Sequence, residues 1–263
     1  MADTDSRTAR APWLIAAAVL VVLGAAGGFW WQSRATGPAA ATEAQLAAAG
    51  IGPGERAAIE ALVRDYILTH PEILPEAMER LQAKGAAERV AADRPAIEAP
   101  FPGAVLGNPK GAVTLVEFTD YACGFCRQSV ADVRALVDAH PDLRIVIREL
   151  PILSNASHEA ARMALAAARQ GRYATFHDAM FAGGRPDPTS IAAAARGAGV
   201  DLAAATAFAR GAEAEAELSK NLALATKLGI TGTPAWVVGD RLLVGAVGRD
   251  ALEQAIVEAR KAG

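Results

Sequence analysis

The sequence is poor in cysteine: only Cys123 and Cys126 occur among its 263 residues, three positions apart. So close a pair cannot connect distant segments, which excludes a small secreted fold held together by several disulfides. A zinc centre needs four ligands. No second C-x-x-C motif exists, and the four histidines are scattered along the chain. The two cysteines therefore form a plain local disulfide or a chemical site, and we expect no metal there.

Aromatic residues and basic charge are also scarce. Aromatics make up 5% of the residues, whereas the hydrophobic fraction is 52% and rich in alanine, which favours packed helices over an all-β sandwich. The net charge is -3 and no run of Lys and Arg occurs, so the chain has no basic field for a nucleic-acid backbone. We expect a helix-rich α/β protein that does not bind nucleic acid.

One long apolar run lies near the N-terminus, at residues 12–31. About 20 uncharged residues in a helix match a bilayer core of roughly 30 Å. Arg7 and Arg10 precede the run, so we expect residues 1–11 in the cytoplasm and a single-pass signal anchor in the bacterial inner membrane, with the rest in the periplasm. The alternative is a cleaved signal peptide and a soluble periplasmic protein, although such peptides usually have a shorter apolar core.

The next three segments differ in composition. Residues 32–54 predict a flexible tether, and residues 85–111, with four prolines, predict a linker. Between them, residues 55–84 predict two amphipathic helices, the second opened by a capping box from Thr69 to Glu72. Two such helices need a partner surface, which either the main domain supplies, as a docked hairpin, or a second copy supplies, in an oligomer.

The main domain is expected over residues 112–263. The pattern predicts a buried strand at 113–118, a helix starting at the cysteine pair and a second strand at 143–147, which together form a βαβ unit with parallel strands. A helical insertion at about 154–229 follows. The domain then ends in a hairpin and a last amphipathic helix.

The cysteine spacing after a strand is typical of a redox dithiol. A thiol attacks a disulfide only as thiolate, and a helix N-terminus stabilises that negative charge. Cys123 lies at the predicted first turn, so we expect it to be the exposed nucleophile and Cys126 the resolving thiol. With only Gly124 and Phe125 between them, the two sulfurs can form the disulfide Cys123–Cys126 without moving the helix.

Three stretches, VEFTDYACGFC, HEAARMALAAARQGRYATFHDAMF and GITGTPAWVVGD, together resemble the DsbA-like class of the thioredoxin superfamily. The resemblance implies a thioredoxin fold with a helical insertion and a thiol-disulfide oxidoreductase without metal or organic cofactor. It also implies that Pro234 is cis and lies against the cysteines, and that Thr233 pairs with the backbone of a substrate. Several relatives carry a buried acid for proton transfer at the position of Glu117. The alternative for Glu117 is an edge-facing strand carboxylate.

The stretch ALVRDYILTHPEILPEAMERLQ resembles the N-terminal helical domain of ScsC-like members, a domain that supports oligomer formation in those proteins. The resemblance therefore implies an oligomer through residues 55–84.

Gly124-Phe125 departs from the Pro-His of the best-known DsbA enzymes, so the redox direction stays open among oxidase, isomerase and reductase. The expected partners are exported proteins with cysteines and a membrane redox partner. The alternative function is copper binding or copper tolerance through the same two thiols, since soft sulfur ligands favour Cu(I).

Two further groups of residues need a structure for their interpretation. Phe125, Ile230, Trp236 and Val237 are apolar residues near the motifs, and we expect some of them to form a surface for unfolded chains. His177, like His158, lies in the helical insertion, where a surface or packing role is the expectation.

Overall fold

The computed structural model describes residue 42 and residues 45–262. The predicted signal anchor at 12–31 lies outside these residues. Within the described part of the chain, no helix is both long and apolar enough to cross a bilayer. The chain divides into two compact units, Met1–Pro75 and Glu76–Gly263, and each is considered by itself.

The main helix of the first unit is α3, Pro53–Thr69. Pro53 occupies its first turn, and the Gly52 N–H donates to Glu55 Oε2 at 2.9 Å. The predicted capping box at 69–72 is wrong, because the Thr69 hydroxyl donates back to Asp65 O at 2.8 Å and thus closes α3. The next helix, α4, begins at Ile73.

The predicted linker at 85–111 is also wrong over its first half, since α4 extends over Ile73–Glu98 with Pro95 inside it. A proline in a helix removes one backbone bond and costs about 3 kcal/mol. The alanine-rich sequence favours the helix, and Val90 and Ile97 are fully buried in a core that includes Leu224 and Leu228. Tertiary packing therefore outweighs the breaker.

The second unit contains a sheet in the order β1-β3-β2-β4-β5. Its strands are β1, Val105–Gly107; β2, Val113–Thr119; β3, Leu143–Glu149; β4, Ala235–Val238; and β5, Arg241–Val244. Strands β2 and β3 are parallel, which confirms the predicted βαβ unit, and the other neighbours are antiparallel. The short edge strand β1 was not predicted and lies in the expected linker.

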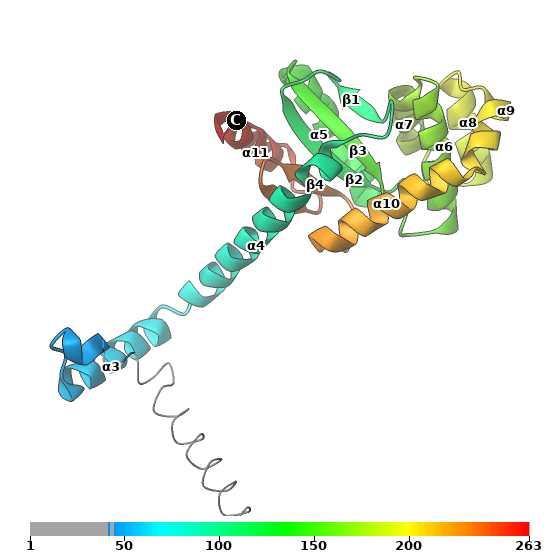
Figure 1. Cartoon of the computed structure of the whole chain (residues 1–263). Coiled ribbons are helices and arrows are strands. Elements are labelled where there is room, and N and C mark those ends of the chain that lie inside the picture. Colours follow the sequence, from blue (N-terminus) through cyan, green and yellow to red (C-terminus); the bar gives the residue numbers. More distant parts are fainter. Residues whose placement is uncertain (1–41, 43–44, 263) are drawn as a thin grey trace, which may run out of the picture. The chain divides into compact units, whose positions relative to one another are not determined.

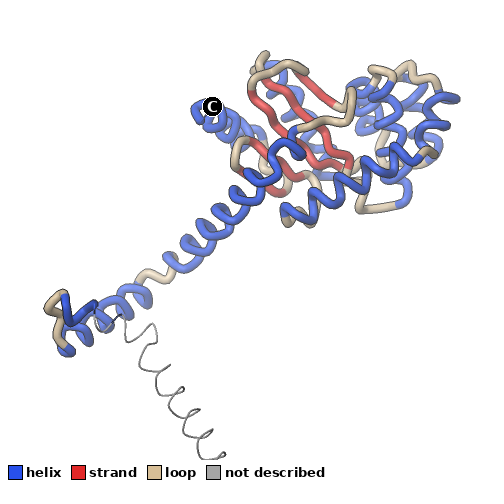
Figure 2. The backbone as a smooth tube through the Cα atoms, in the orientation of Figure 1, coloured by secondary structure: helices blue, strands red, loops and turns tan. Residues whose placement is uncertain are grey.

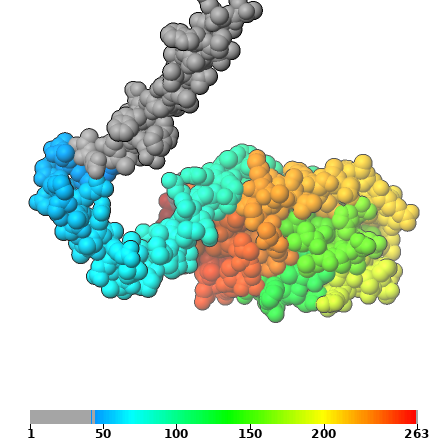
Figure 3. Space-filling model, turned by 90° about the horizontal axis from the view of Figure 1, so that it is seen from below, coloured from blue at the N-terminus to red at the C-terminus, as the bar shows by residue number. Residues whose placement is uncertain are grey.

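Helices cover both faces of this sheet (Figures 1 and 2). Helices α5, Gly124–Ala139, and α11, Arg249–Ala262, pack on the face that carries Leu115 and Ile145. On the face with Val116 and Phe118 lie α10, Ala212–Leu228, and the C-terminal part of α4. These two helices run side by side (Figure 3), and Lys227 Nζ of α10 is 2.6 Å from Asp93 Oδ1 of α4.

The helical insertion follows β3, as predicted for residues 154–229. It consists of α6, Asn155–Arg169; α7, Tyr173–Ala182; α8, Pro188–Gly197; α9, Leu202–Ala209; and α10. Helices α6 and α7 are separated by a short break. The break falls at Gly171, whose φ of 69° is a left-handed conformation that glycine adopts without strain.

Candidate active site

The two cysteines lie where β2 leads into α5. Cys123 is the N-cap of α5, and its sulfur accepts the N–H of Cys126 at 3.4 Å. This places the Cys123 sulfur against the free N–H groups of the first turn, which favour a negative charge. Both cysteines are thiols in this structure, and the disulfide between them stays a prediction.

Cys123 is less exposed than the sequence predicted. Its exposed fraction is only 6%, and that of Cys126 is 0%. The prediction of an exposed nucleophile is therefore wrong for this thiol form, because the backbone at Thr233 covers the sulfur. Cys123 is still the more accessible of the two. The exposed part of the motif is the side chain of Phe125, at 60%, beside Gly124.

The segment before β4 forms the opposite wall of the site. The peptide bond between Thr233 and Pro234 is cis, as the resemblance implied. Because β4 pairs with β2, this segment reaches the cysteines, and the Cys123 thiol donates to Thr233 O at 3.2 Å. Pro234 is buried and offers no N–H to the sulfurs.

Of the four apolar residues expected near the site, only Phe125 is exposed. Ile230, Trp236 and Val237 belong to the core, with exposed fractions of 6%, 0% and 2%. The Trp236 indole N–H donates to Gly245 O at 3.0 Å, which satisfies its polar atom inside the domain. The expected apolar surface for unfolded chains is therefore reduced, among these four, to Phe125.

Glu117 lies in the middle of β2, opposite Ile147 of β3 and Trp236 of β4. It is buried rather than edge-facing, because β2 has a neighbouring strand on each side. Burial raises the pKa of Glu117 to about 8, since the charged form loses its hydration. Its Oε2 atom has no hydrogen-bond partner in the described part of the chain.

The charge of Glu117 affects the resolving thiol. Burial raises the pKa of Cys126 strongly, and the negative charge of Glu117 raises it further. The nearby Thr119 hydroxyl lowers both pKa values, although it makes no hydrogen bond of normal geometry. At neutral pH both groups are therefore mostly protonated, and an ionised Glu117 disfavours ionisation of Cys126.

Asp120 is a residue that sequence reasoning missed. It is buried, its Oδ1 accepts the Ala122 N–H at 2.8 Å, and its backbone oxygen accepts the Cys123 N–H at 3.0 Å. Its Oδ2 accepts the N–H groups of Ile152 and Leu153, which follow β3. The available signal was an Asp directly after a strand, a residue that commonly bonds the backbone of a turn.

A dithiol at the start of a helix that lies against a cis-proline segment, on neighbouring strands of a mixed sheet, is typical of a redox-active thioredoxin fold. The DSBA-like thioredoxin domain family matches residues 114–257, more than half of the chain, and the chain belongs to this family. Residues 55–88 match the N-terminal domain of the copper resistance protein ScsC. The chain thus carries a thiol-disulfide oxidoreductase domain of the DsbA and ScsC type, preceded by a helical ScsC-type segment.

Solved structures support this assignment. A thioredoxin-like oxidoreductase from Silicibacter pomeroyi is 43% identical, with 65% of this chain and 99% of that chain covered and a TM-score of 0.62. A linker-deletion variant of Proteus mirabilis ScsC is 28% identical, covering 81% and 98%, also with a TM-score of 0.62. The thiol-disulfide exchange protein α-DsbA2 from Wolbachia pipientis is 26% identical, covering 68% and 97%, with the same TM-score.

The curated relatives are much longer than the matched segment. An Na(+)/H(+) antiporter NhaA of Salinispora tropica is 28% identical over 160 residues, which is 59% of this chain and only 24% of the antiporter. A second antiporter, from Salinispora arenicola, matches to the same extent. The chain therefore spans about a quarter of these proteins.

Proposed function

We propose that this chain exchanges disulfides with exported proteins, with Cys123 as nucleophile and Cys126 as resolving thiol. The observation that carries the proposal is the Cys123 sulfur, which caps α5 and lies 3.2 Å from Thr233 O beside the cis proline. A substrate strand that displaces the thiol from this carbonyl would bring its own sulfur to Cys123. Membership in the DSBA-like family supports this reading.

The exchange balances without a cofactor. The Cys123 thiolate attacks one sulfur of a substrate disulfide, forms a mixed disulfide and releases the other substrate sulfur as thiolate, which takes up a proton. Cys126 then loses its proton and attacks the Cys123 sulfur. The substrate leaves reduced, and Cys123 and Cys126 are oxidised to a disulfide. The same steps in reverse oxidise a substrate dithiol.

Glu117 is the proposed proton acceptor for Cys126. The resolving thiol is buried and its pKa is raised, so it needs a base close by in order to react. With its pKa at about 8, Glu117 can both take and return a proton near neutral pH. In the oxidising direction it would protonate Cys126 as this sulfur leaves.

Two cysteine variants test the proposal. Cys123→Ser should abolish reduction of insulin disulfides by dithiothreitol beyond the uncatalysed rate, because the nucleophile is lost. Cys126→Ser should instead accumulate a mixed disulfide on Cys123, visible by mass spectrometry. Equal activity of wild type and Cys123→Ser would refute the exchange function.

A second candidate function is copper binding, because residues 55–88 match a domain named for copper resistance. Two thiolates are soft ligands that suit Cu(I). Cu(I) competition with a chelator separates the two functions when it is applied to Pro234→Ala. This variant should lose disulfide exchange, because the wall of the site changes, and should keep Cu(I) affinity, because both sulfurs remain.

For the cellular location, we propose that residues 12–31 anchor the chain in the inner membrane and that the dithiol works on the periplasmic side, with a membrane protein as redox partner. The charge-free apolar run supports the anchor, and the ScsC match supports an exported domain. A cleaved signal is the competing outcome. N-terminal sequencing of the mature protein distinguishes them.

We further propose that residues 55–84 form an oligomer. No residue of α3 is buried, and the apolar residues Leu62 and Tyr66 are 67% and 51% exposed. Such an uncovered apolar face is typical of an interface. Leu62→Glu should reduce the mass per particle in light scattering, whereas Leu222→Glu, at an exposed apolar residue of α10, should not.

A further inference from the structure

A second buried acid lies close to the dithiol and has no part in the exchange steps above. Glu149 ends β3 and is fully buried. Its Oε1 accepts the hydroxyl of Tyr173 at 2.7 Å and the hydroxyl of Tyr121 at 3.0 Å. Its Oε2 has no hydrogen-bond partner among the described residues. Such an orphan oxygen in a core calls for an explanation beyond packing.

The surroundings of Glu149 keep it neutral at physiological pH. Burial raises the pKa of Glu149 to about 8, against the lowering effect of the two tyrosines, and the charges of Asp120 and Glu117 raise it further. Burial also raises the pKa of both tyrosines, so they stay donors. Burial lowers the pKa of His177, to about 4, which leaves the imidazole uncharged.

Tyr121 connects this acid to the cysteines. It lies two residues before Cys123, in the loop whose other fixed point is Asp120. Its ring packs on Phe181 with centroids 4.9 Å apart, and its hydroxyl is 3.3 Å from His177 Nδ1. The bond to Glu149 thus ties the loop before Cys123 to the end of β3 and to helix α7.

We propose that Glu149 is a positioning residue of the dithiol site, which holds the loop before Cys123 through the Tyr121 hydroxyl and so stabilises the dithiol relative to the disulfide. This inference rests on the proposed exchange function. These contacts belong to the thiol form, in which the Cys123 sulfur accepts the Cys126 N–H. A disulfide has no S–H to donate to Thr233 O, so its formation changes the contacts of the Cys123 sulfur, and we expect a loop held in the thiol arrangement to favour the reduced state.

The experiment measures the equilibrium of the full chain with reduced and oxidised glutathione. Tyr121→Phe and Glu149→Leu should each shift it toward the protein disulfide by about threefold or more. Glu149→Gln keeps a neutral acceptor for both hydroxyls, so its equilibrium at pH 7 should equal that of the wild type, unlike that of Glu149→Leu. Tyr173→Phe is the matched control, because it removes a bond to the same oxygen without touching the loop, and it should change the equilibrium by less than about twofold.

The outcomes separate the two claims. A wild-type chain that does not exchange with glutathione would refute the proposed function itself. If the wild type exchanges but Tyr121→Phe stays within about twofold of it, the inference fails. A fall in the urea midpoint of Tyr121→Phe would then show that the role of the cluster is structural. An equal shift in Tyr121→Phe and Tyr173→Phe would also overturn it, because the effect would then not pass through Tyr121.

Discussion

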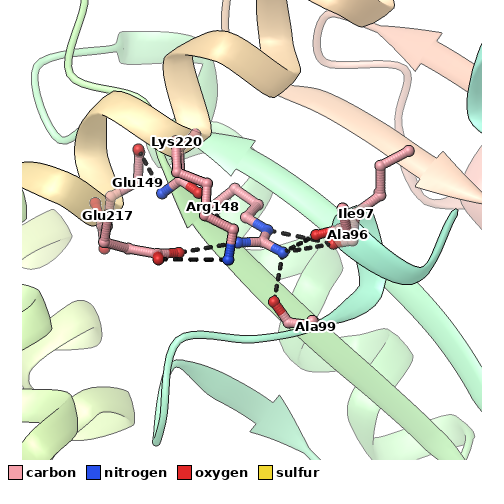
Figure 4. A network of polar contacts seen from close by, with 8 residues as sticks. Ala96, Ile97, Ala99, Arg148, Glu149, Glu217 and Lys220 are labelled. Atoms are coloured by element: carbon pink, nitrogen blue, oxygen red, sulfur yellow. Dashed lines mark hydrogen bonds and ion pairs between the residues drawn. The ribbon is translucent and has the colours of Figure 1, made fainter. Parts of the chain in front are cut away.

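Two buried polar sites lie at the ends of neighbouring strands, and they differ in whether their polar atoms have hydrogen-bond partners. At Arg148, on β3, every nitrogen of the guanidinium finds an acceptor (Figure 4). At the dithiol site, beside β2, Glu117 Oε2 and the hydroxyls of Thr119 and Thr233 have no partner in the described residues. Fully paired buried groups stabilise a fold, whereas unpaired ones are costly and persist mainly where chemistry needs them.

The Arg148 site joins three elements of the second unit. Its Nη2 donates to the backbone oxygens of Ala96 and Ile97, at the end of α4, and of Ala99 just beyond it, and its Nη1 donates to Glu217 Oε1 of α10 at 2.9 Å and to Asn221. The bound carbonyls are among those that a helix C-terminus leaves without intrahelical partners. This single side chain therefore replaces a C-cap for α4.

Removal of the Arg148 charge should have the largest effect on stability. Arg148→Met leaves the carbonyls at the end of α4 without their donor and leaves Glu217 with only its longer ion pair, to Lys220 at 3.6 Å, so we expect a loss of about 3–5 kcal/mol in the free energy of unfolding, measured with urea. Arg241→Gln is the control, because its ion pair with Glu258 is exposed to solvent and should contribute little to stability. Similar losses in the two variants would break the distinction between a satisfied buried site and ordinary surface pairing.

The two sites also differ in how far the sequence predicts them. The dithiol is local: the C-x-x-C spacing, the strand before it and the helix after it all lie within 27 residues, from Val113 to Ala139, and these were predicted. The Arg148 site was not, because its acceptors come from α4, about 50 residues earlier in the chain, and from α10, about 70 residues later. The same long-range contacts keep α4 helical through Pro95, where local breaker rules predicted a linker.

Burial was the other quantity that local patterns did not supply. The sequence left open whether Glu117 is buried or edge-facing, and strand order decides this, because β4 arrives from residues 235–238 and pairs beside Glu117. The same pairing brings Thr233 over Cys123, which is why the nucleophile is covered. Asp120 and the Glu149 cluster likewise depend on contacts between β2, β3 and α7.

The pH dependence of stability should reveal the cost of the unpaired acids. Glu117 and Glu149 have pKa values of about 8 in the folded chain, raised by burial above the unfolded value near 4.5. Between these values the folded state binds more protons than the unfolded state. Stability is therefore greatest at low pH and is lost as pH rises, by about 1.4 kcal/mol per pH unit for each acid, until the folded pKa is passed.

The window from pH 6.5 to 8 isolates this effect, because His177, with its pKa lowered to about 4, changes its contribution only below that range. Urea unfolding of the reduced chain should show stability falling through the window, and Glu117→Gln should remove about half of the slope. Glu79→Gln, an exposed acid of α4, should leave the slope unchanged. A flat profile for the wild type would show that both acids have partners, which would erase the contrast with Arg148.

The smallest effect concerns two threonines of the same strand, and it separates stability from reactivity. Thr119 is fully buried and its hydroxyl lacks a hydrogen bond, whereas the Thr114 hydroxyl accepts from Arg144 Nη2 at 2.8 Å. Valine has the same shape and suits a strand. Thr114→Val should cost about 1 kcal/mol, while Thr119→Val should be neutral or stabilising by up to about 1 kcal/mol, because an unpaired hydroxyl leaves the core.

The reactivity of the two threonine variants should differ in the opposite sense from their stability: Thr119→Val should react more slowly than Thr114→Val. The Thr119 hydroxyl lowers the pKa of Glu117 and of Cys126, so its removal makes the resolving thiol harder to ionise. Release of the mixed disulfide should then slow by roughly threefold in stopped-flow assays in which Thr114→Val behaves as wild type. An unchanged release rate in Thr119→Val would mean that the hydroxyl contributes neither to stability nor to reactivity. A slower reaction in a more stable protein would show directly that the dithiol site keeps an unpaired group for its chemistry.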